Sequence, residues 1–328
     1  MKKIGLAIVA VAALFVCSMN APAQDAQDSK VTIRIWPDGA PNSSGPNARD
    51  AGFEPILVIY KAQEPNGLAV LGLPGGGYAM LSKTHEAHDF YKFYNSIGVT
   101  YAVLEYRLPN EHSEIPLSDV QKAMVILRGM SEELGFTKLG IQGCSAGGHL
   151  ASTAATHYTS DENRPDFQIL FYPVITMDKS FTHISSHDLL LGQNASEELE
   201  IKFSNEKQVT SDTPPAIIFH STDDRLVPVE NSIRYYQALV ANRVSASMHL
   251  YPRGSHGWGA GDNFAYKAQW TSELEAWLNN EILKPQGQGG FGGFGGFGGF
   301  PGGGFPGGGF PGGGFPGGGA PAGAPAQR

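Results

Sequence analysis

One serine lies in a setting that could make it a nucleophile. Residues 143–147, Gly-Cys-Ser-Ala-Gly, have the spacing G-x-S-x-G, which is typical of a nucleophile elbow, a sharp turn between a strand and a helix. The run 138–142 predicts a short buried strand before this turn, and 149–157 predicts a helix after it. Gly143 and Gly147 are small enough for the close backbone approach that such a turn needs. We therefore predict that Ser145 is a nucleophile.

A serine hydroxyl needs a base to take its proton and an acid to orient that base. On elbow-type scaffolds the acid and then the histidine follow the serine along the chain. Asp223 and Asp224 follow a predicted buried strand at 214–221, and His256 lies in a glycine-rich turn after the last predicted strand, 247–251. We predict His256 as the base and Asp224 as the orienting acid, because Asp224 lies four residues before Pro228. Asp223 remains the alternative, and the aspartate not used would cap the next turn or face solvent.

Acyl transfer also needs N–H donors for the tetrahedral oxyanion. The predicted strand 68–73 ends in Pro74 and three consecutive glycines, 75–77, whose amides can turn inward because no side chain obstructs them. We predict that the amides of Gly76 and Gly77, together with that of Ala146 after the nucleophile, form an oxyanion hole. The alternative interpretation of the glycine run is a plain flexible turn.

The remaining histidines with notable spacing, and the cysteine beside Ser145, are predicted to have structural rather than catalytic or metal-binding roles. His85 with His88, and His183 with His187, have spacings that could hold a metal on a helix, but no third ligand cluster and no H-E-x-x-H motif accompany them. We therefore predict no metal and no cofactor. His220 lies inside an apolar strand and is predicted to be structural. Cys144 precedes the elbow serine and is predicted to be a small buried packing residue.

Strand and helix patterns alternate along the chain. The pattern predicts an edge strand at 31–36 and further strands at 56–60, 99–106 and 167–172. It predicts helices at 87–97, 118–134, 229–240 and 265–282. Such alternation predicts an α/β fold with a mainly parallel sheet covered by helices on both faces. Functional side chains then gather beyond the carboxyl ends of the strands. The polar stretch 176–213, with one predicted helix at 196–203, interrupts the pattern and forms either a wall of the site or a surface excursion.

Five segments carry a resemblance to a known family: PGGGY (74–78), GCSAGGHLA (143–151), SDTPPAIIFH (211–220), DDRLVPVENS (223–232) and GSHGWG (254–259). Together they resemble α/β-hydrolase-fold carbohydrate esterases of the acetyl xylan esterase-like branch, which is related to the hormone-sensitive-lipase and BD-FAE-like esterases. The resemblance covers about 31–283. Pro74 stands where lipases often have histidine, and Cys144 where they often have aspartate. Both departures point towards the polysaccharide-esterase branch.

The resemblance implies a serine esterase that removes acetyl groups from plant polysaccharides or oligosaccharides without a cofactor. Tyr78 and Trp258 flank the oxyanion loop and His256, so their rings either stack on sugars or pack around the loops. Feruloyl esterase or general short-chain carboxylesterase activity is the main alternative, since the sequence does not reveal the size of the acyl pocket. A serine peptidase, or an inactive hydrolase-like protein that binds glycans, is a further alternative.

The composition agrees with a single catalytic domain. The formal net charge is −8 at pH 7, which argues against nucleic acid or an anionic membrane as partner. The N-terminal segment has the features of a secretory signal peptide. It has a charged start at Lys2 and Lys3, an apolar run at 4–16 and a small-x-small pattern at 21–23. We therefore predict a signal peptide at 1–23 that is cleaved after Ala23. We expect a secreted or periplasmic protein, and acylation at Cys17 is the alternative. The predicted catalytic domain spans 24–285.

The segment 286–328 has a different composition. It holds 22 of the 43 glycines in GGF and then PGGGF repeats, so the glycine content of the catalytic domain is ordinary. Such repeats cannot bury enough surface to offset the entropy of ordering. We predict a disordered tail that acts either as a tether without specific contacts or as a binding segment for an unidentified partner.

Overall fold

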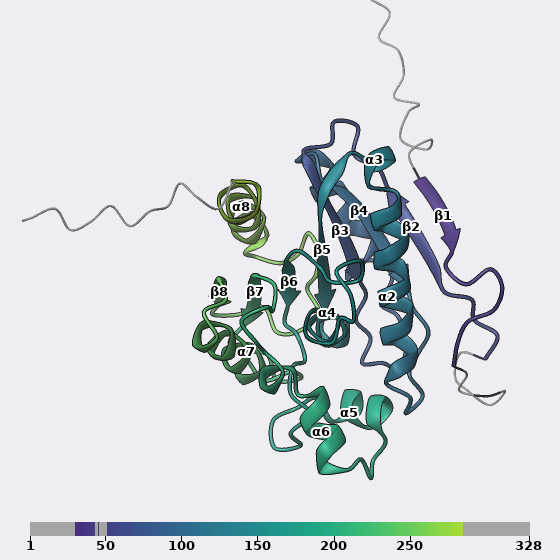
Figure 1. Cartoon of the computed structure of the whole chain (residues 1–328). Helices are drawn as coiled ribbons and strands as arrows, with labels where there is room; N and C mark the ends of the chain where they lie inside the picture. The colour runs from purple at the N-terminus through teal and green to yellow at the C-terminus, as the bar shows by residue number, and fades with distance from the viewer. Residues whose placement is uncertain (1–29, 43–44, 46–50, 285–328) are drawn as a thin grey trace, which may run out of the picture. The chain divides into compact units, whose positions relative to one another are not determined.

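The computed structural model describes residues 30–42, 45 and 51–284. They form an eight-stranded sheet in the order β1-β2-β4-β3-β5-β6-β7-β8 (Figure 1). The strands are β1 (Lys30–Arg34), β2 (Ile56–Tyr60), β3 (Gly67–Leu73), β4 (Thr100–Glu105), β5 (Phe136–Cys144), β6 (Gln168–Phe171), β7 (Ala216–Ser221) and β8 (Ala246–Tyr251). β2 runs antiparallel to both β1 and β4, and the remaining pairs are parallel. The predicted mainly parallel sheet with an antiparallel edge strand is confirmed.

Helices connect the strands and cover both faces of the sheet. They are α1 (Tyr91–Ser96), α2 (Glu114–Gly129), α3 (Ser131–Leu134), α4 (Ala146–Thr156), α5 (Ile184–Leu191), α6 (Glu197–Phe203), α7 (Glu230–Ala241) and α8 (Lys267–Trp277). Short 3₁₀ turns span His88–Phe90 and Asn205–Lys207, and a π-helical turn follows α8 at Leu278–Leu283. In Figure 1, α5 and α6 lie beyond the end of the sheet towards which the parallel strands point.

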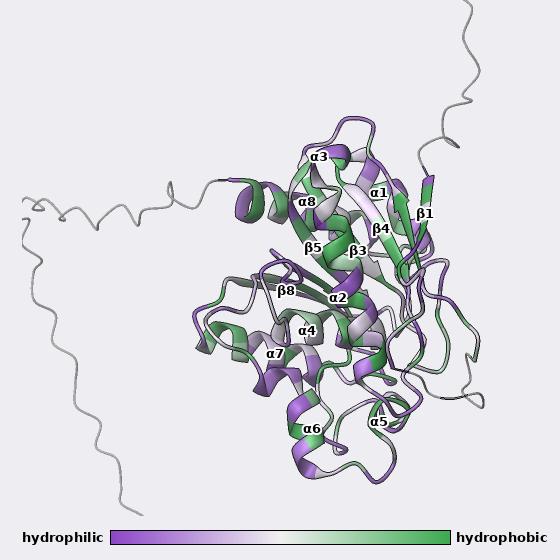
Figure 2. Cartoon of the chain, turned by 45° about the vertical axis from the view of Figure 1, so that its right-hand side comes forward, coloured by the Kyte–Doolittle hydropathy of each residue, from purple (hydrophilic) through white to green (hydrophobic). Residues whose placement is uncertain are grey.

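Alternating residues of the central strands enter two separate cores. In β3, Ala69, Leu71 and Leu73 pack in one core with the buried sides of α2, α4 and α7. Leu68 and Val70 enter the other core with α1 and α8. A strand apolar on both faces is what burial between two helical layers requires. Figure 2 shows the matching pattern, with hydrophobic central strands and helices such as α6 that carry both hydrophilic and hydrophobic residues.

Several helix boundaries differ from the predicted ones. α2 begins at Glu114 rather than at residue 118. It contains Pro116 in its first turn, where a missing N–H costs no intrahelical hydrogen bond. The predicted helix 87–97 is a 3₁₀ turn followed by the short α1. α5 was not predicted, because its sequence ISSHDLLL lacks strong helix formers in its first turn and Leu190 and Leu191 stabilise it by burial.

The predicted signal peptide at 1–23 and the predicted tail at 286–328 lie outside the described residues. Among the described helices, none has the length and apolar character needed to cross a bilayer.

Candidate active site

Ser145 lies at the sharp turn between β5 and α4. Its φ of 55° and ψ of −120° are an unusual backbone conformation for a residue other than glycine, as expected of a nucleophile elbow. A Cβ added to Gly143 would lie 2.0 Å from the carbonyl oxygen of Gly147. The turn therefore closes only because the flanking residue lacks a side chain. Ser145 itself is 5% exposed.

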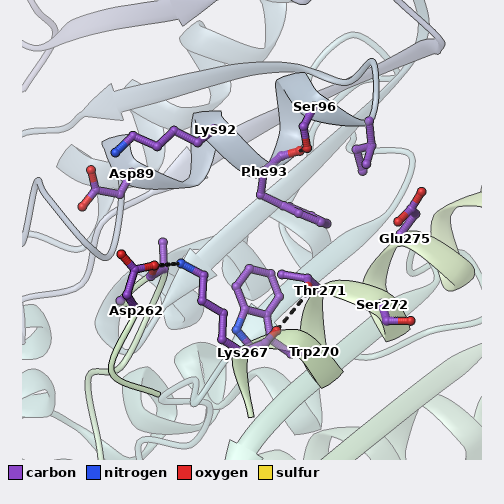
Figure 3. Close-up of a pocket in the computed structure, with 13 residues that line it drawn as sticks. Asp89, Lys92, Phe93, Ser96, Asp262, Lys267, Trp270, Thr271, Ser272 and Glu275 are labelled. Atoms are coloured by element: carbon purple, nitrogen blue, oxygen red, sulfur yellow. Dashed lines mark hydrogen bonds and ion pairs between the residues drawn. The ribbon is translucent and has the colours of Figure 1, made fainter. Parts of the chain in front are cut away.

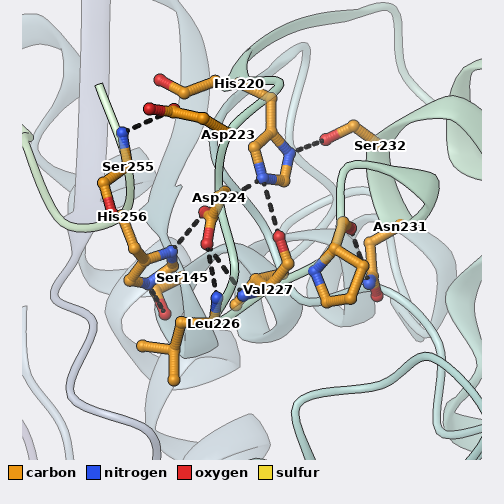
Figure 4. Close-up of polar contacts among 12 residues, drawn as sticks. Ser145, His220, Asp223, Asp224, Leu226, Val227, Asn231, Ser232, Ser255 and His256 are labelled. Carbon is orange, nitrogen blue, oxygen red and sulfur yellow. Dashed lines mark hydrogen bonds and ion pairs between the residues drawn. The ribbon is translucent and has the colours of Figure 1, made fainter. Parts of the chain in front are cut away.

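The structure brings Ser145, His256 and Asp224 together in one hydrogen-bonded line (Figure 4). The Oγ atom of Ser145 lies 2.8 Å from Nε2 of His256. The Nδ1 atom of the same ring lies 2.6 Å from Oδ2 of Asp224. With Nδ1–H donating to the carboxylate, Nε2 is free to accept the serine proton, which is the arrangement that activates a serine hydroxyl.

Asp224 has hydrogen-bond donors on both of its carboxylate oxygens. Oδ1 accepts from the backbone amides of Leu226 and Val227, each at 2.9 Å. Oδ2 accepts from His256 and also lies 3.2 Å from Nε2 of His220. Burial raises the pKa of this carboxyl, but hydrogen bonds from His220 and His256 lower it by more, so the pKa lies well below its usual range. Asp224 is therefore ionised at neutral pH, where its negative charge can stabilise the imidazolium form of His256.

Asp223 is exposed, which is one of the two positions predicted for the unused aspartate. It also has a role that was not predicted, because its Oδ1 accepts a 2.8 Å hydrogen bond from the amide of Ser255. Ser255 has a positive φ of 55° and directly precedes His256. The two adjacent aspartates thus contact the same loop, Asp224 through the imidazole and Asp223 through the backbone.

His220 and Tyr172 are site residues that the sequence interpretation missed. Nδ1 of His220 lies 2.7 Å from the hydroxyl of Ser232, while Nε2 faces Asp224 and the carbonyl of Val227. The ring of Tyr172 meets that of His256 edge-on at 4.7 Å, and its hydroxyl accepts from the amide of Gly259 at 2.8 Å. The apolar sequence around His220 gave no sign of its polar partners, and no local motif identifies Tyr172 as a site residue.

The predicted oxyanion loop follows β3 directly. The amides of Gly76 and Gly77 donate no hydrogen bond within the described part of the chain. Gly76 has φ 120°, and a Cβ there would lie 2.1 Å from the carbonyl oxygen of Met80, so a larger residue cannot take its place. Ala146 is the first residue of α4, so its amide has no intrahelical acceptor. These three unpaired amides are suited to hold a developing negative charge.

The two aromatic residues predicted to contact sugar have little free surface. Tyr78 is 1% exposed, and its hydroxyl lies 2.9 Å from Nδ1 of His149, so its ring packs inside the core and the stacking alternative is wrong. Trp258 is 8% exposed and stacks on Phe264 at 3.9 Å between ring centroids. The packing alternative therefore describes both rings.

The histidine pairs considered for metal binding are separated by other contacts. His187 is fully buried between Asp188 and Glu200, whereas His183 contacts Ser186. Within the ranges that the structure describes, no three His, Cys, Asp or Glu side chains form a group able to hold a metal ion. Cys144 is fully buried, as predicted, and burial raises the pKa of its thiol well above the ordinary value.

Two pockets lie near the loop that carries His256. One, of about 530 Å³, opens beside the imidazole and is lined by His85, Arg253, Trp258 and Asn263 among others. The second, of about 550 Å³, lies between α1 and α8 (Figure 3). Its wall contains an ion pair between Asp262 and Lys267, and none of the three triad residues lines it. The first pocket therefore belongs to the candidate site, and the second lies outside it.

Comparisons with known proteins agree with this site. A family model described as BD-FAE matches residues 57–239. The chain is 40% identical over 230 residues to an acetylxylan esterase of Xylanibacter ruminicola, a match covering 68% of this chain and 48% of that protein. It is 35% identical over 223 residues to endo-1,4-beta-xylanase B of Butyrivibrio fibrisolvens, covering 63% of this chain and 35% of that protein. The chain thus spans about half or less of the length of these curated relatives.

A solved structure matches more completely. An acetyl ester-xyloside bifunctional hydrolase from Caldicellulosiruptor lactoaceticus superposes with a TM-score of 0.69 at 34% identity, covering 76% of this chain and 95% of that one. Together with the strand order, this similarity confirms the predicted α/β-hydrolase fold.

Proposed function

Because this chain belongs to the BD-FAE family, we propose that it is a serine esterase that removes acetyl groups from xylan or related plant oligosaccharides. The observation that carries the proposal is the continuous hydrogen-bonded line from Ser145 through His256 to Asp224. The names of the similar proteins, an acetylxylan esterase and an acetyl ester-xyloside hydrolase, support the choice of substrate.

The reaction follows from the positions of the side chains. His256 Nε2 takes the proton of Ser145 as Oγ attacks the ester carbonyl carbon, and the amides of Gly76, Gly77 and Ala146 hold the oxyanion. The imidazolium then gives its proton to the sugar oxygen as the bond between this oxygen and the carbonyl carbon breaks. The acetyl group remains bound to Ser145. The same imidazole then takes a proton from water, which attacks the acyl carbon. The bond to Ser145 Oγ breaks, Oγ regains its proton from the imidazolium, and acetate is released. Asp224 stabilises the imidazolium at each proton transfer.

The expected leader at 1–23 supports export of the enzyme, which suits a polymer substrate found outside the cell. N-terminal sequencing of the exported protein tests this part of the proposal. A chain beginning at Gln24 supports it, and a retained Met1 contradicts it.

The experiment that tests the activity measures acetate released from acetylated xylan, acetylated mannan, pectin and simple sugar acetates by the wild-type chain and by Ser145→Ala. We expect the wild type to release acetate from xylan most readily, and Ser145→Ala to lose several orders of magnitude of that rate. Feruloylated arabinoxylan is the competing substrate, and faster release of ferulate than of acetate would favour the feruloyl esterase alternative. A folded Ser145→Ala variant with near wild-type turnover would refute the mechanism.

A further inference from the structure

His183 lies beside the candidate oxyanion loop, although it comes from the segment 176–213 that interrupts the α/β pattern. A Cβ added to Gly77 would lie 3.4 Å from Cε1 of His183. The residue occupies the position before α5, yet its side chain makes no capping hydrogen bond to that helix. Its imidazole therefore lies against the loop through Cε1, and it contacts the first turn of α5 through the hydroxyl of Ser186 rather than through a backbone amide.

The chain leading to His183 is fixed to the element that follows the triad acid. Asn231, fully buried at the start of α7, accepts from the amides of Ile175 and Thr176 at 3.0 and 3.2 Å. Its Nδ2 donates to the carbonyl of Phe181 at 3.1 Å. The loop of Asp224 leads into α7, so these bonds hold the segment before His183 in register with the candidate site.

One nitrogen of His183 is open for a ligand. Nδ1 lies 2.8 Å from the hydroxyl of Ser186. Nε2 makes no hydrogen bond within the residues that the structure describes. When the Ser186 hydroxyl donates to Nδ1, the proton of the neutral ring is on Nε2, which then offers an N–H donor.

The charge state of the ring suits a hydrogen bond to a neutral group. Burial lowers the pKa of His183, the nearby His256 lowers it further, and Asp224 opposes the shift, so the pKa lies below its ordinary value. His183 is therefore uncharged at neutral pH.

We propose that His183 is a substrate-contact residue whose Nε2–H donates to a hydroxyl of the sugar ring that carries the ester, a role that rests on the proposed esterase function. The acetyl group has one polar atom besides the scissile oxygen, its carbonyl oxygen, and the backbone amides of the oxyanion loop take it. The polar atoms left nearby in a carbohydrate ester are the hydroxyls next to the acetylated carbon. His183 therefore selects acetylated sugars over simple alkyl or aryl acetates.

The test compares two substrates in one variant. His183→Ala should lower kcat/KM for an acetylated xylo-oligosaccharide by about tenfold, which corresponds to one lost hydrogen bond. The same variant should keep kcat/KM for p-nitrophenyl acetate within about threefold, because that ester has no hydroxyl to contact. His183→Gln retains an N–H donor and should recover part of the activity towards the sugar ester.

Two controls make the result decisive. Ser185→Ala changes an exposed neighbour in the first turn of α5 and should alter neither activity. Equal losses on both substrates in His183→Ala would overturn the proposal, because His183 would then support the catalytic groups rather than bind substrate. Unchanged activity on both would overturn it as well. If His183→Ala fails to fold, His183→Leu, which fills more of the space and has no donor, is judged by the same ratio of the two activities. A wild-type chain that cleaves p-nitrophenyl acetate but no sugar ester would refute the proposed function and this role with it.

Discussion

The two adjacent aspartates, Asp223 and Asp224, make different contacts with the loop that carries His256. The carboxylate of Asp224 accepts from two backbone amides on one oxygen and faces two imidazoles with the other. Asp223 contacts the amide of Ser255 instead. Four donors around one carboxylate keep it ionised and fix its direction, which an orienting acid needs. The distance to Pro228 indicated the aspartate that contacts His256, but the sequence carried no sign that the other one holds the histidine loop.

Substituting each aspartate separates these two roles. Asp224→Asn should lower kcat for p-nitrophenyl acetate by about 1,000- to 10,000-fold, because an amide at this position favours the wrong tautomer of His256. Asp223→Asn should stay within about fivefold, since the amide oxygen can still accept from Ser255. Steady-state kinetics of the two purified variants checks this. Similar losses in both variants would contradict the assignment of Asp224 as the orienting acid.

The meeting of Ser145, Asp224 and His256 could be predicted, because each follows a strand end and has a recognisable local signal. His220 and Tyr172 could not be, since their importance comes from contacts across the sheet. His220 reaches Ser232 in α7 and Tyr172 reaches Gly259 in the histidine loop. The sequence left open whether Tyr78 contacts sugar or packs in the core, because its closeness to the oxyanion loop along the chain does not reveal which way its side chain points.

At the scale of elements, α4 is joined to the oxyanion loop and to α6 through His149. This fully buried ring contacts the hydroxyl of Tyr78 with Nδ1 at 2.9 Å and the carbonyl of Phe203 with Nε2 at 2.8 Å. The neutral imidazole satisfies both partners, accepting at Nδ1 and donating at Nε2. Burial, together with the nearby charge of His157, lowers the pKa of His149 to about 4, although the bond to Phe203 opposes the shift. This helix thus depends on an uncharged histidine.

The folded-state pKa of His149 lies below the unfolded value, so the unfolded chain binds a proton first as the pH falls. The stabilisation is complete above about pH 6.5 and is lost progressively as the pH falls towards about 4. Between about pH 7.5 and pH 5 this one group should account for a loss of about 2 kcal/mol in the free energy of unfolding. Urea unfolding of the wild type and of His149→Gln measures it. The variant should show a shallower dependence on pH, and identical slopes would exclude His149 as a source.

The elements of the insertion show where local signals fail. The helix predicted at 196–203 is close to the observed Glu197–Phe203, whose first turn is acidic and is capped by the side chain of Ser196. α5 had no such signal and forms because Leu190 and Leu191 pack against the core. The same segment holds His183 beside the oxyanion loop, so the least predictable element carries the proposed substrate contact.

At the scale of the whole molecule, the alternating pattern of strands and helices was sufficient to predict the sheet and the end at which the site forms. It did not predict that β2 runs antiparallel to β4, because an apolar strand has no feature that records its direction. Ser145, Asp224 and His256 follow β5, β7 and β8, whose carboxyl ends lie along the same edge. Parallel pairing alone therefore accounts for residues 111 positions apart meeting in one site.

The segment 286–328 is expected to be dispensable for chemistry, because every proposed catalytic group lies between residues 76 and 256. Deleting it should leave kcat/KM for p-nitrophenyl acetate within about twofold, as expected of a glycine-rich tether without specific contacts. Kinetics of the full chain and the shortened chain test this prediction. A large loss confined to polymeric substrates would instead assign the tail a role in binding the polymer.

The proposed mechanism requires that His256 activates Ser145, which then forms an acyl-enzyme. Labelling with a fluorophosphonate, which reacts with activated serine hydroxyls, tests this most directly when the modified peptide is identified by mass spectrometry. We predict a single adduct on Ser145 in the wild type and its loss in a folded His256→Ala variant. An adduct on a different residue, or equal labelling of Ser145 without the imidazole, would contradict the account.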